Sequence, residues 1–114
     1  MSTVANLYEL DGFELAPGVR AKPLFGEGAM LNLLEFEAGA TVEAHEHPHE
    51  QLGLVVSGAL VLRIQGVDHE LRPGDAYRIP GGVEHAAWTN DAGCRVLDVF
   101  QPVREDYRER FAGS

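Results

Sequence analysis

The sequence predicts an all-β fold, a sandwich or barrel, followed by a short C-terminal helix. Short apolar runs recur along most of the chain, and turns rich in Gly or Pro separate them at regular intervals. The last segment changes pattern, because its apolar residues recur at every fourth position. The chain has 114 residues, of which 45% are hydrophobic, so we expect one domain over residues 1–114 with a substantial core.

Each expected strand is bounded by residues that favour turns. Ser57-Gly58 divides two apolar runs and predicts a tight hairpin. Residues 66–68 are interpreted as a second turn, and residues 72–75 as a third with proline at a favoured position. The expected strands span residues 29–37, 41–44, 52–56, 59–65, 76–79, 86–89 and 95–101.

The expected helix lies in the tail of the chain. Val103, Tyr107 and Phe111 alternate with charged residues at a spacing of four, and Pro102 stands where a short helix can begin. Residues four apart share one helix face, so we expect this helix to pack an apolar stripe on the barrel.

The charge of the chain restricts its partners. Acidic residues number 18 against 9 Lys plus Arg, which gives a formal net charge of −9. Such a surface repels phosphate backbones and anionic lipids, so we expect no nucleic acid and no membrane as partner. A small anionic sugar or organic acid would need a local cation inside its site. The single Cys94 excludes an internal disulfide, and the N-terminus lacks a signal-peptide pattern, so we expect a cytoplasmic protein.

The histidines predict a metal site. His45 and His47 alternate with other residues, so in an extended chain they point to one face, and Gln51 has the same parity. His85 follows a Pro-Gly-Gly turn that can direct it inward and supply the third imidazole. We expect these four residues to bind one divalent ion, for which Zn, Ni, Fe and Mn are all suitable. His49 is expected at the pocket rim, where it would contact substrate. The alternative is a polar loop of surface histidines.

Two segments resemble the motifs of the cupin family. The first motif is carried by Gly39, His45, His47, Gln51 and Gly58, and the second by Gly74, Pro80, Gly82, His85 and Thr89. Both occur in the family's order and separation. The resemblance implies a double-stranded β-helix, or jelly-roll, barrel with an internal metal held by three His and one Glu. A homodimer is also expected from the family.

The sequence departs from that pattern at Gln51, where cupins usually have Glu. A neutral amide leaves the full dipositive charge on the ion, which favours anionic ligands and makes a stronger Lewis acid. The alternative is that Gln51 marks a lost ligand in a metal-free cupin. Glu50 has the opposite strand parity and should face away from the site.

A narrower resemblance is carried by residues 45–53 and 97–107, which are similar to the pectin-degradation cupins that linearise unsaturated uronates. In those proteins the metal ligands are three His and one Gln. The resemblance implies active-site roles for Asp98 and Arg104, with Phe100 between them as a substrate-binding residue. It also implies a substrate class, the cyclic 4,5-unsaturated uronates released by pectate and alginate lyases.

The residue pattern of the last strand gives partial support. Asp98 and Phe100 share one face and Leu97 and Val99 the other, so either pair can line the barrel interior. We favour an inward Asp98 that acts as general acid or base, because an outward Asp98 would leave Phe100 exposed beside it.

Two arginines are candidates to bind an anionic substrate. Arg104 can pair with a substrate carboxylate in bidentate fashion, or equally with Glu105 or Asp106 at the surface. Arg78 is a further candidate pocket cation. The sequence thus predicts a metal-dependent cupin that converts 4,5-unsaturated uronates to their linear keto form. The alternatives are another cupin enzyme such as a dioxygenase, or a cupin that only binds a small molecule.

Overall fold

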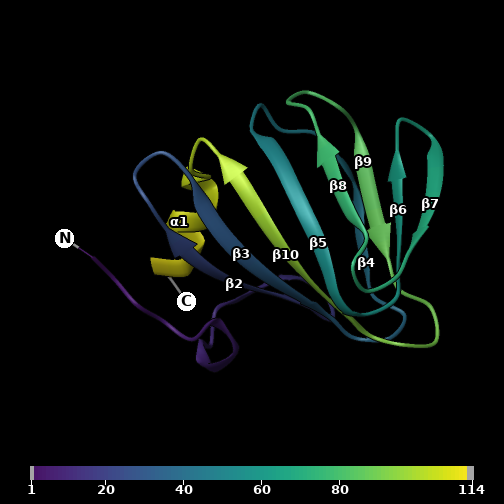
Figure 1. Ribbon diagram of the computed structural model, residues 1–114, viewed down its shortest axis with the longest axis horizontal. Helices are drawn as coiled ribbons and strands as arrows, with labels where there is room; N and C mark the ends of the chain where they lie inside the picture. The colour runs from purple at the N-terminus through teal and green to yellow at the C-terminus, as the bar shows by residue number, and fades with distance from the viewer. Residues whose placement is uncertain (1, 113–114) are drawn as a thin grey trace.

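The structure is a computed structural model that describes residues 2–112. Within these residues ten strands form two antiparallel sheets, of six strands in the order β1-β2-β3-β10-β5-β8 and four in the order β4-β9-β6-β7 (Figure 1). The elements are η1 (Leu7–Glu9), β1 (Phe13–Ala16), β2 (Val19–Phe25), β3 (Met30–Phe36), β4 (Thr41–His45), β5 (Glu50–Gly58), β6 (Leu60–Ile64), β7 (Val67–Leu71), β8 (Ala76–Ile79), β9 (His85–Trp88), β10 (Cys94–Gln101) and α1 (Glu105–Ala112).

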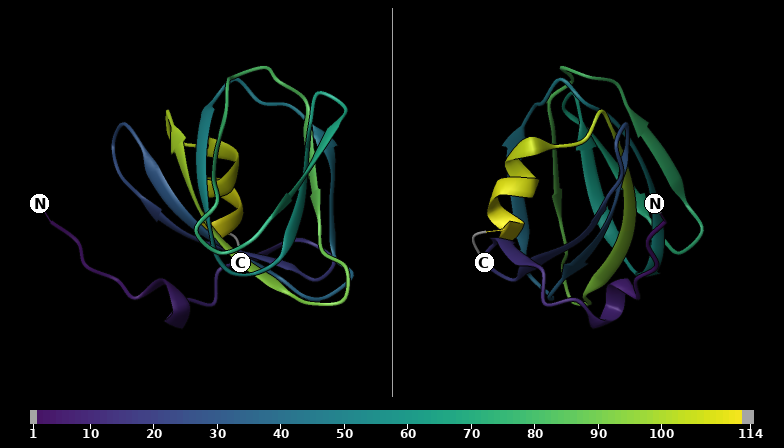
Figure 2. Two further views of the ribbon diagram at one scale, coloured as in Figure 1. Left: turned by 45° about the vertical axis from the view of Figure 1, so that its right-hand side comes forward. Right: turned by 90° about the vertical axis from the view of Figure 1, so that its left-hand side faces the viewer.

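The two sheets curve around one another into a barrel (Figure 2). Strand β10 lies between β3 and β5, and its side chains alternate between the barrel interior and the outside as a strand period of two requires. Val96, Asp98 and Phe100 point inward and are each at most 2% exposed, whereas Leu97 and Val99 are half-buried on the outer face. The all-β prediction is therefore confirmed, and the inward orientation of Asp98 is the observed one.

The hairpin formed by β1 and β2 was not among the expected strands. It turns at Pro17-Gly18, where Gly18 has a positive φ of 77°, and β2 pairs with β3 along its whole length. Alternating charged residues and Pro23 weaken the strand pattern of β2, because proline is usually confined to strand edges. Pairing with the strongly apolar β3 overrides that local signal.

The interpretation of residues 66–68 as a turn is wrong, because β7 begins at Val67. The turn consists of Gln65 and Gly66, whose φ angles of 49° and 79° make a two-residue hairpin between β6 and β7. Strand β7 is exposed along four of its five residues. It therefore lacks the alternation of apolar and polar residues that a half-buried strand shows.

The expected C-terminal helix is present as α1, which begins at Glu105 rather than at Pro102. Its apolar stripe packs on the inner side of the barrel, as expected. Tyr107 makes edge contacts with Phe13 and Phe100 at ring-centroid distances of 5.3 and 5.6 Å. Within residues 2–112, no helix has the length and hydrophobicity needed to cross a membrane.

Candidate metal centre and cavity

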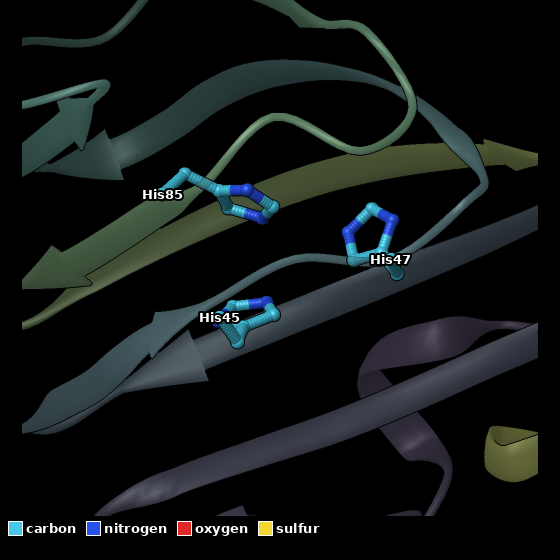
Figure 3. A group of neighbouring side chains, drawn as sticks. All are labelled: His45, His47 and His85. Carbon is cyan, nitrogen blue, oxygen red and sulfur yellow. The ribbon is translucent and has the colours of Figure 1, made fainter.

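Three histidines from separate segments meet inside the barrel (Figure 3). His45 ends β4 and is paired in register with His85, the first residue of β9. His47 lies in the connection from β4 to β5. One ligand nitrogen from each ring lies within 4.8 Å of the other two. The sequence prediction that these three imidazoles converge is thus confirmed, since strand pairing joins segments forty residues apart.

Backbone carbonyls orient all three rings. The Nδ1 atoms of His45, His47 and His85 lie 2.8, 3.1 and 2.9 Å from the carbonyl oxygens of Glu43, His49 and Val83. A carbonyl oxygen only accepts, so each Nδ1 carries the proton and each Nε2 carries a lone pair. Such a bond on the remote nitrogen is what fixes the tautomer and orientation of metal-bound histidines.

A divalent ion fits the electrostatics of this cluster. Gln51 Oε1 lies 3.1 Å from His47 Nε2, so two lone pairs face each other unless a cation or proton lies between them. The Nε2 atom of His85 is buried without a hydrogen-bond partner in the described part of the chain. Burial, with further contributions from Arg104 and His85, lowers the pKa of His47 to about 4, so its imidazole is neutral and able to ligate. We refer to His45, His47, Gln51 and His85 as the ligand set.

Asp98 lies next to the ligand set. Its carboxyl is 2% exposed, and Tyr77 Oη donates a hydrogen bond of 2.6 Å to its Oδ1 atom. Burial raises the pKa of Asp98 to about 6, although hydrogen bonds from Tyr77 and Gln51 act in the opposite direction. Burial and the neighbouring Asp98 also raise the pKa of Tyr77 well above 10, so the phenol stays protonated and donates.

Asp98 and the ligand-set residues His45, Gln51 and His85 line one cavity inside the barrel. Arg104 lines this cavity too, from the segment that precedes α1. Its side chain is 11% exposed, and its guanidinium lies 4.1 Å from the ring centre of Tyr107 and 5.0 Å from that of Phe100. Arg104 pairs with Asp106 at 2.8 Å, which is the surface partner offered as the alternative by the sequence analysis, while its pairing with a substrate carboxylate stays a prediction. Among the described residues that line the cavity, Arg104 is the one Arg or Lys.

The remaining candidates lie farther out. His49 is half-buried near Arg104 and Asp106, which is consistent with a place at the rim. The expectation that Arg78 faces the pocket is wrong: its side chain is 64% exposed and pairs with Glu50 at 3.1 Å on the outside of the sheet. On β8 the parity of Ile79, which is fully buried, assigns Arg78 to the outer face and Tyr77 to the inner one.

Sequence reasoning missed Tyr77, although two signals for it were present. Its parity with Ile79 placed it on the inner face, and a glycine at position 53, inside the apolar strand β5, indicates a close approach by another group. Register between strands was needed to connect the two, because Gly53 pairs with Tyr77 on one side and with Asp98 on the other.

Comparison with known proteins extends these observations. Residues 32–100 match the family described as cupin domain. The pectin degradation protein KdgF of Dickeya dadantii is 29% identical over 96 residues, which cover 82% of this chain and 87% of that protein. Dimethylsulfoniopropionate lyase DddW of Ruegeria pomeroyi is 33% identical over 101 residues, and this chain spans only 64% of that lyase.

A solved structure gives the same result. The structure of KdgF from Halomonas sp. superposes with a TM-score of 0.85 at 30% identity, over 93% of this chain and 98% of that one. The expected jelly-roll fold and the resemblance to small cupins of pectin degradation are thereby confirmed.

Proposed function

Because this chain belongs to the cupin domain family, we propose that it is a metal-dependent enzyme that converts 4,5-unsaturated uronate monosaccharides to their linear keto form. One observation carries the proposal: a buried carboxyl, Asp98, and a largely buried cation, Arg104, line the same cavity as three members of the ligand set, His45, Gln51 and His85. The similarity to two proteins named KdgF, one of them called a pectin degradation protein, supports this substrate class.

The proposed reaction is an isomerisation that consumes no co-reactant. The bond between C1 and the ring oxygen breaks, the anomeric hydroxyl loses its proton as C1 becomes an aldehyde, and the ring oxygen becomes an enol hydroxyl on C5. The enol then gives up its O–H proton while C4 gains a proton, which leaves a ketone at C5. The catalyst therefore needs one group that takes protons from oxygen and returns a proton to carbon.

Asp98 is the group assigned to that proton transfer, because it is the carboxyl that lines the cavity. Arg104 is assigned to the substrate carboxylate, since its planar guanidinium matches a carboxylate in bidentate fashion. Phe100 lies beneath the guanidinium of Arg104 and makes an edge contact with the ring of His47, so it supports the cation beside the ligand set. A local cation is required because the protein as a whole carries a charge of −9.

The ligand set is assigned to one divalent ion, whose identity among Zn, Ni, Fe and Mn stays a prediction. When bound, such an ion supplies stabilisation for negative charge that develops on a substrate oxygen. Gln51 contributes a neutral oxygen, so the charge of the ion is not offset by a ligating carboxylate.

The test uses unsaturated uronate freshly released by a pectate or alginate lyase. We expect the purified protein to accelerate the decay of the ultraviolet absorption of the conjugated alkene, and a chelator to remove that acceleration. Asp98→Asn should abolish turnover while metal content stays unchanged. Asp68→Asn, which alters an exposed carboxylate on β7, is the matched control and should retain full activity. Equal decay rates with and without the wild-type protein would refute the proposed substrate.

A second candidate function is favoured by one observation, the 33% identity to a dimethylsulfoniopropionate lyase. That substrate is also a small molecule with a carboxylate, and its cleavage also requires a base in the cavity. Gas chromatography of the headspace would detect dimethyl sulfide if this chain cleaves it. Release of dimethyl sulfide without uronate turnover would replace the first function by the second.

We also propose that the protein is a homodimer that buries the outer face of β5. Leu52, Leu54 and Val56 lie side by side on that face and are 45, 40 and 38% exposed. A contiguous apolar stripe on a sheet surface is typical of an interface between subunits. The cytoplasmic location inferred from the sequence stays a prediction.

A further inference from the structure

Four residues form one row across the inner face of the six-stranded sheet. Asn32 of β3 pairs with Asp98 of β10, Asp98 pairs with Gly53 of β5, and Gly53 pairs with Tyr77 of β8. The row lies one inward-facing position beyond the pair formed by Gln51 and Phe100. It therefore crosses the barrel interior directly beside the ligand set.

Gly53 is what allows Tyr77 and Asp98 to meet. Tyr77 and Asp98 lie on strands separated by β5, a spacing of about 9.6 Å between their backbones. A Cβ atom built on Gly53 would lie 2.1 Å from Cζ and 2.3 Å from Oη of Tyr77. The aromatic ring thus occupies the space where any other residue at position 53 would place its side chain. Across this gap Tyr77 Oη reaches Asp98 Oδ1 at 2.6 Å.

We propose that Tyr77 is a positioning residue for the proton-transfer carboxyl of Asp98, and that Gly53 is required because it admits the ring of Tyr77. This inference rests on the proposed function in its kinetic consequences, but the pairing itself does not depend on any substrate. Tyr77 lines the cavity and contacts Asp98 and Gln51, and its hydroxyl acts on the reaction through the orientation of Asp98.

Asn32, which pairs with Asp98 from β3, explains why Asp98 needs a positioning residue. Asn32 is fully buried, and neither atom of its amide has a hydrogen-bond partner among residues 2–112. An amide in that state is a competing donor for the carboxyl, since a buried donor without an acceptor is costly. The hydroxyl of Tyr77 holds Oδ1 on the side of β5 and β8, where Gln51 also lies, and so keeps the carboxyl facing the ligand set.

The principal test compares Tyr77→Phe with the wild type in the uronate assay. The variant keeps the ring that fills the gap above Gly53 and loses only the hydroxyl. We expect kcat to fall by about 10²-fold, since misplacing a catalytic group has effects of this size, while KM and metal content stay within twofold. Tyr8→Phe, at a half-exposed tyrosine on the surface, is the control.

The role of glycine is tested separately. Gly53→Ala should lower kcat as Tyr77→Phe does, because the added methyl displaces the ring. Gly28→Ala is the matched control, since a Cβ there meets no atom within 4 Å and no left-handed conformation is involved. In a Tyr77→Ala background, Gly53→Ala should shift the unfolding midpoint far less than in the wild type, because the colliding ring is gone.

A second readout separates this inference from the proposed function. The readout is the denaturant midpoint of unfolding of the metal-loaded protein. We expect Tyr77→Phe to lower this midpoint in the wild type but not in an Asp98→Leu background. Such coupling would support the pairing even if the wild type shows no uronate turnover. Additive midpoint shifts, or a Tyr77→Phe enzyme with wild-type kcat, would overturn the inference.

Discussion

Removal of the metal is expected to lower the melting temperature of this protein by a predictable amount. The ligand set belongs to the folded state only, because strand pairing of β4 with β9 brings His45 and His85 together. An ion present at a hundred times its dissociation constant then stabilises the folded state by about 2.7 kcal/mol. At about 2.1 cal/mol/K per residue, a chain of 114 residues has an unfolding entropy of about 0.24 kcal/mol/K. The corresponding shift is about 11 °C.

The assay is differential scanning calorimetry of protein that was first stripped with a chelator. Each of Zn, Ni, Mn and Fe(II) is then added to separate samples, and the melting temperature is compared with that of the stripped sample. His85→Ala removes one of the three imidazoles, so its melting temperature should respond to the same ions by a small fraction of the wild-type shift. His69→Ala, at an exposed position on β7, should respond like the wild type.

Two results would refute this reasoning. If none of the four ions raises the melting temperature of the wild type, the cluster is not a metal site. If His85→Ala responds as strongly as the wild type, the ions bind elsewhere, for example to the acidic surface. Comparing each variant with its own stripped form removes the effect of the substitution on the metal-free fold.

Three further predictions concern the cavity, the outer sheet and the subunit interface. Arg104→Gln should lower kcat/KM for the uronate by about 10–100-fold, mainly by raising KM, because a charge-assisted bidentate pair with the substrate carboxylate is lost. Steady-state kinetics measure both constants, and an unchanged KM would contradict the prediction. Burial raises the pKa of Glu35, but hydrogen bonds from Lys22 and Arg95 lower it by more, so its pKa lies below the ordinary 4.5. These two contacts therefore stabilise the folded state above pH 4.5, and that stabilisation is lost as the pH falls through the lowered pKa. Glu35→Gln should therefore flatten the loss of stability in acid, measured as denaturant midpoints from about pH 6 to about pH 3, and parallel curves for both proteins would contradict this. Leu54→Arg should convert the dimer to a monomer in size-exclusion chromatography with light scattering, whereas a monomeric wild type would rule out the interface.

The sequence by itself determined the class of the fold and most of the ligand set. Period-two alternation in β5 and β10 is a local property, so it indicates which residues point inward whatever the partners of these strands are. The spacing of His45, His47 and His85 within two motifs was sufficient to predict that three imidazoles converge. The change of period after Pro102 was sufficient to predict a helix.

The local sequence did not indicate that β2 and β7 are strands. Strand β7 is exposed on both faces, and β2 carries charges and a proline, so neither has the pattern of a half-buried strand. Their strand conformation comes from backbone hydrogen bonds to the adjacent strands β6 and β3, and the residue patterns of β7 and β2 do not reveal this pairing.

Only the tertiary structure decided how the catalytic candidates are arranged. The sequence alone was compatible with either face of β8 lining the pocket, so Arg78 was a candidate. The burial of Ile79 assigns the inner face of β8 to Tyr77 and the outer face to Arg78. The contact between Tyr77 and Asp98 depends on the registers of β8 with β5 and of β5 with β10, and on the missing side chain of Gly53 between them. Register joins residues more than twenty positions apart, and no periodicity along a single segment contains that information, because it is set by the closure of the whole sheet.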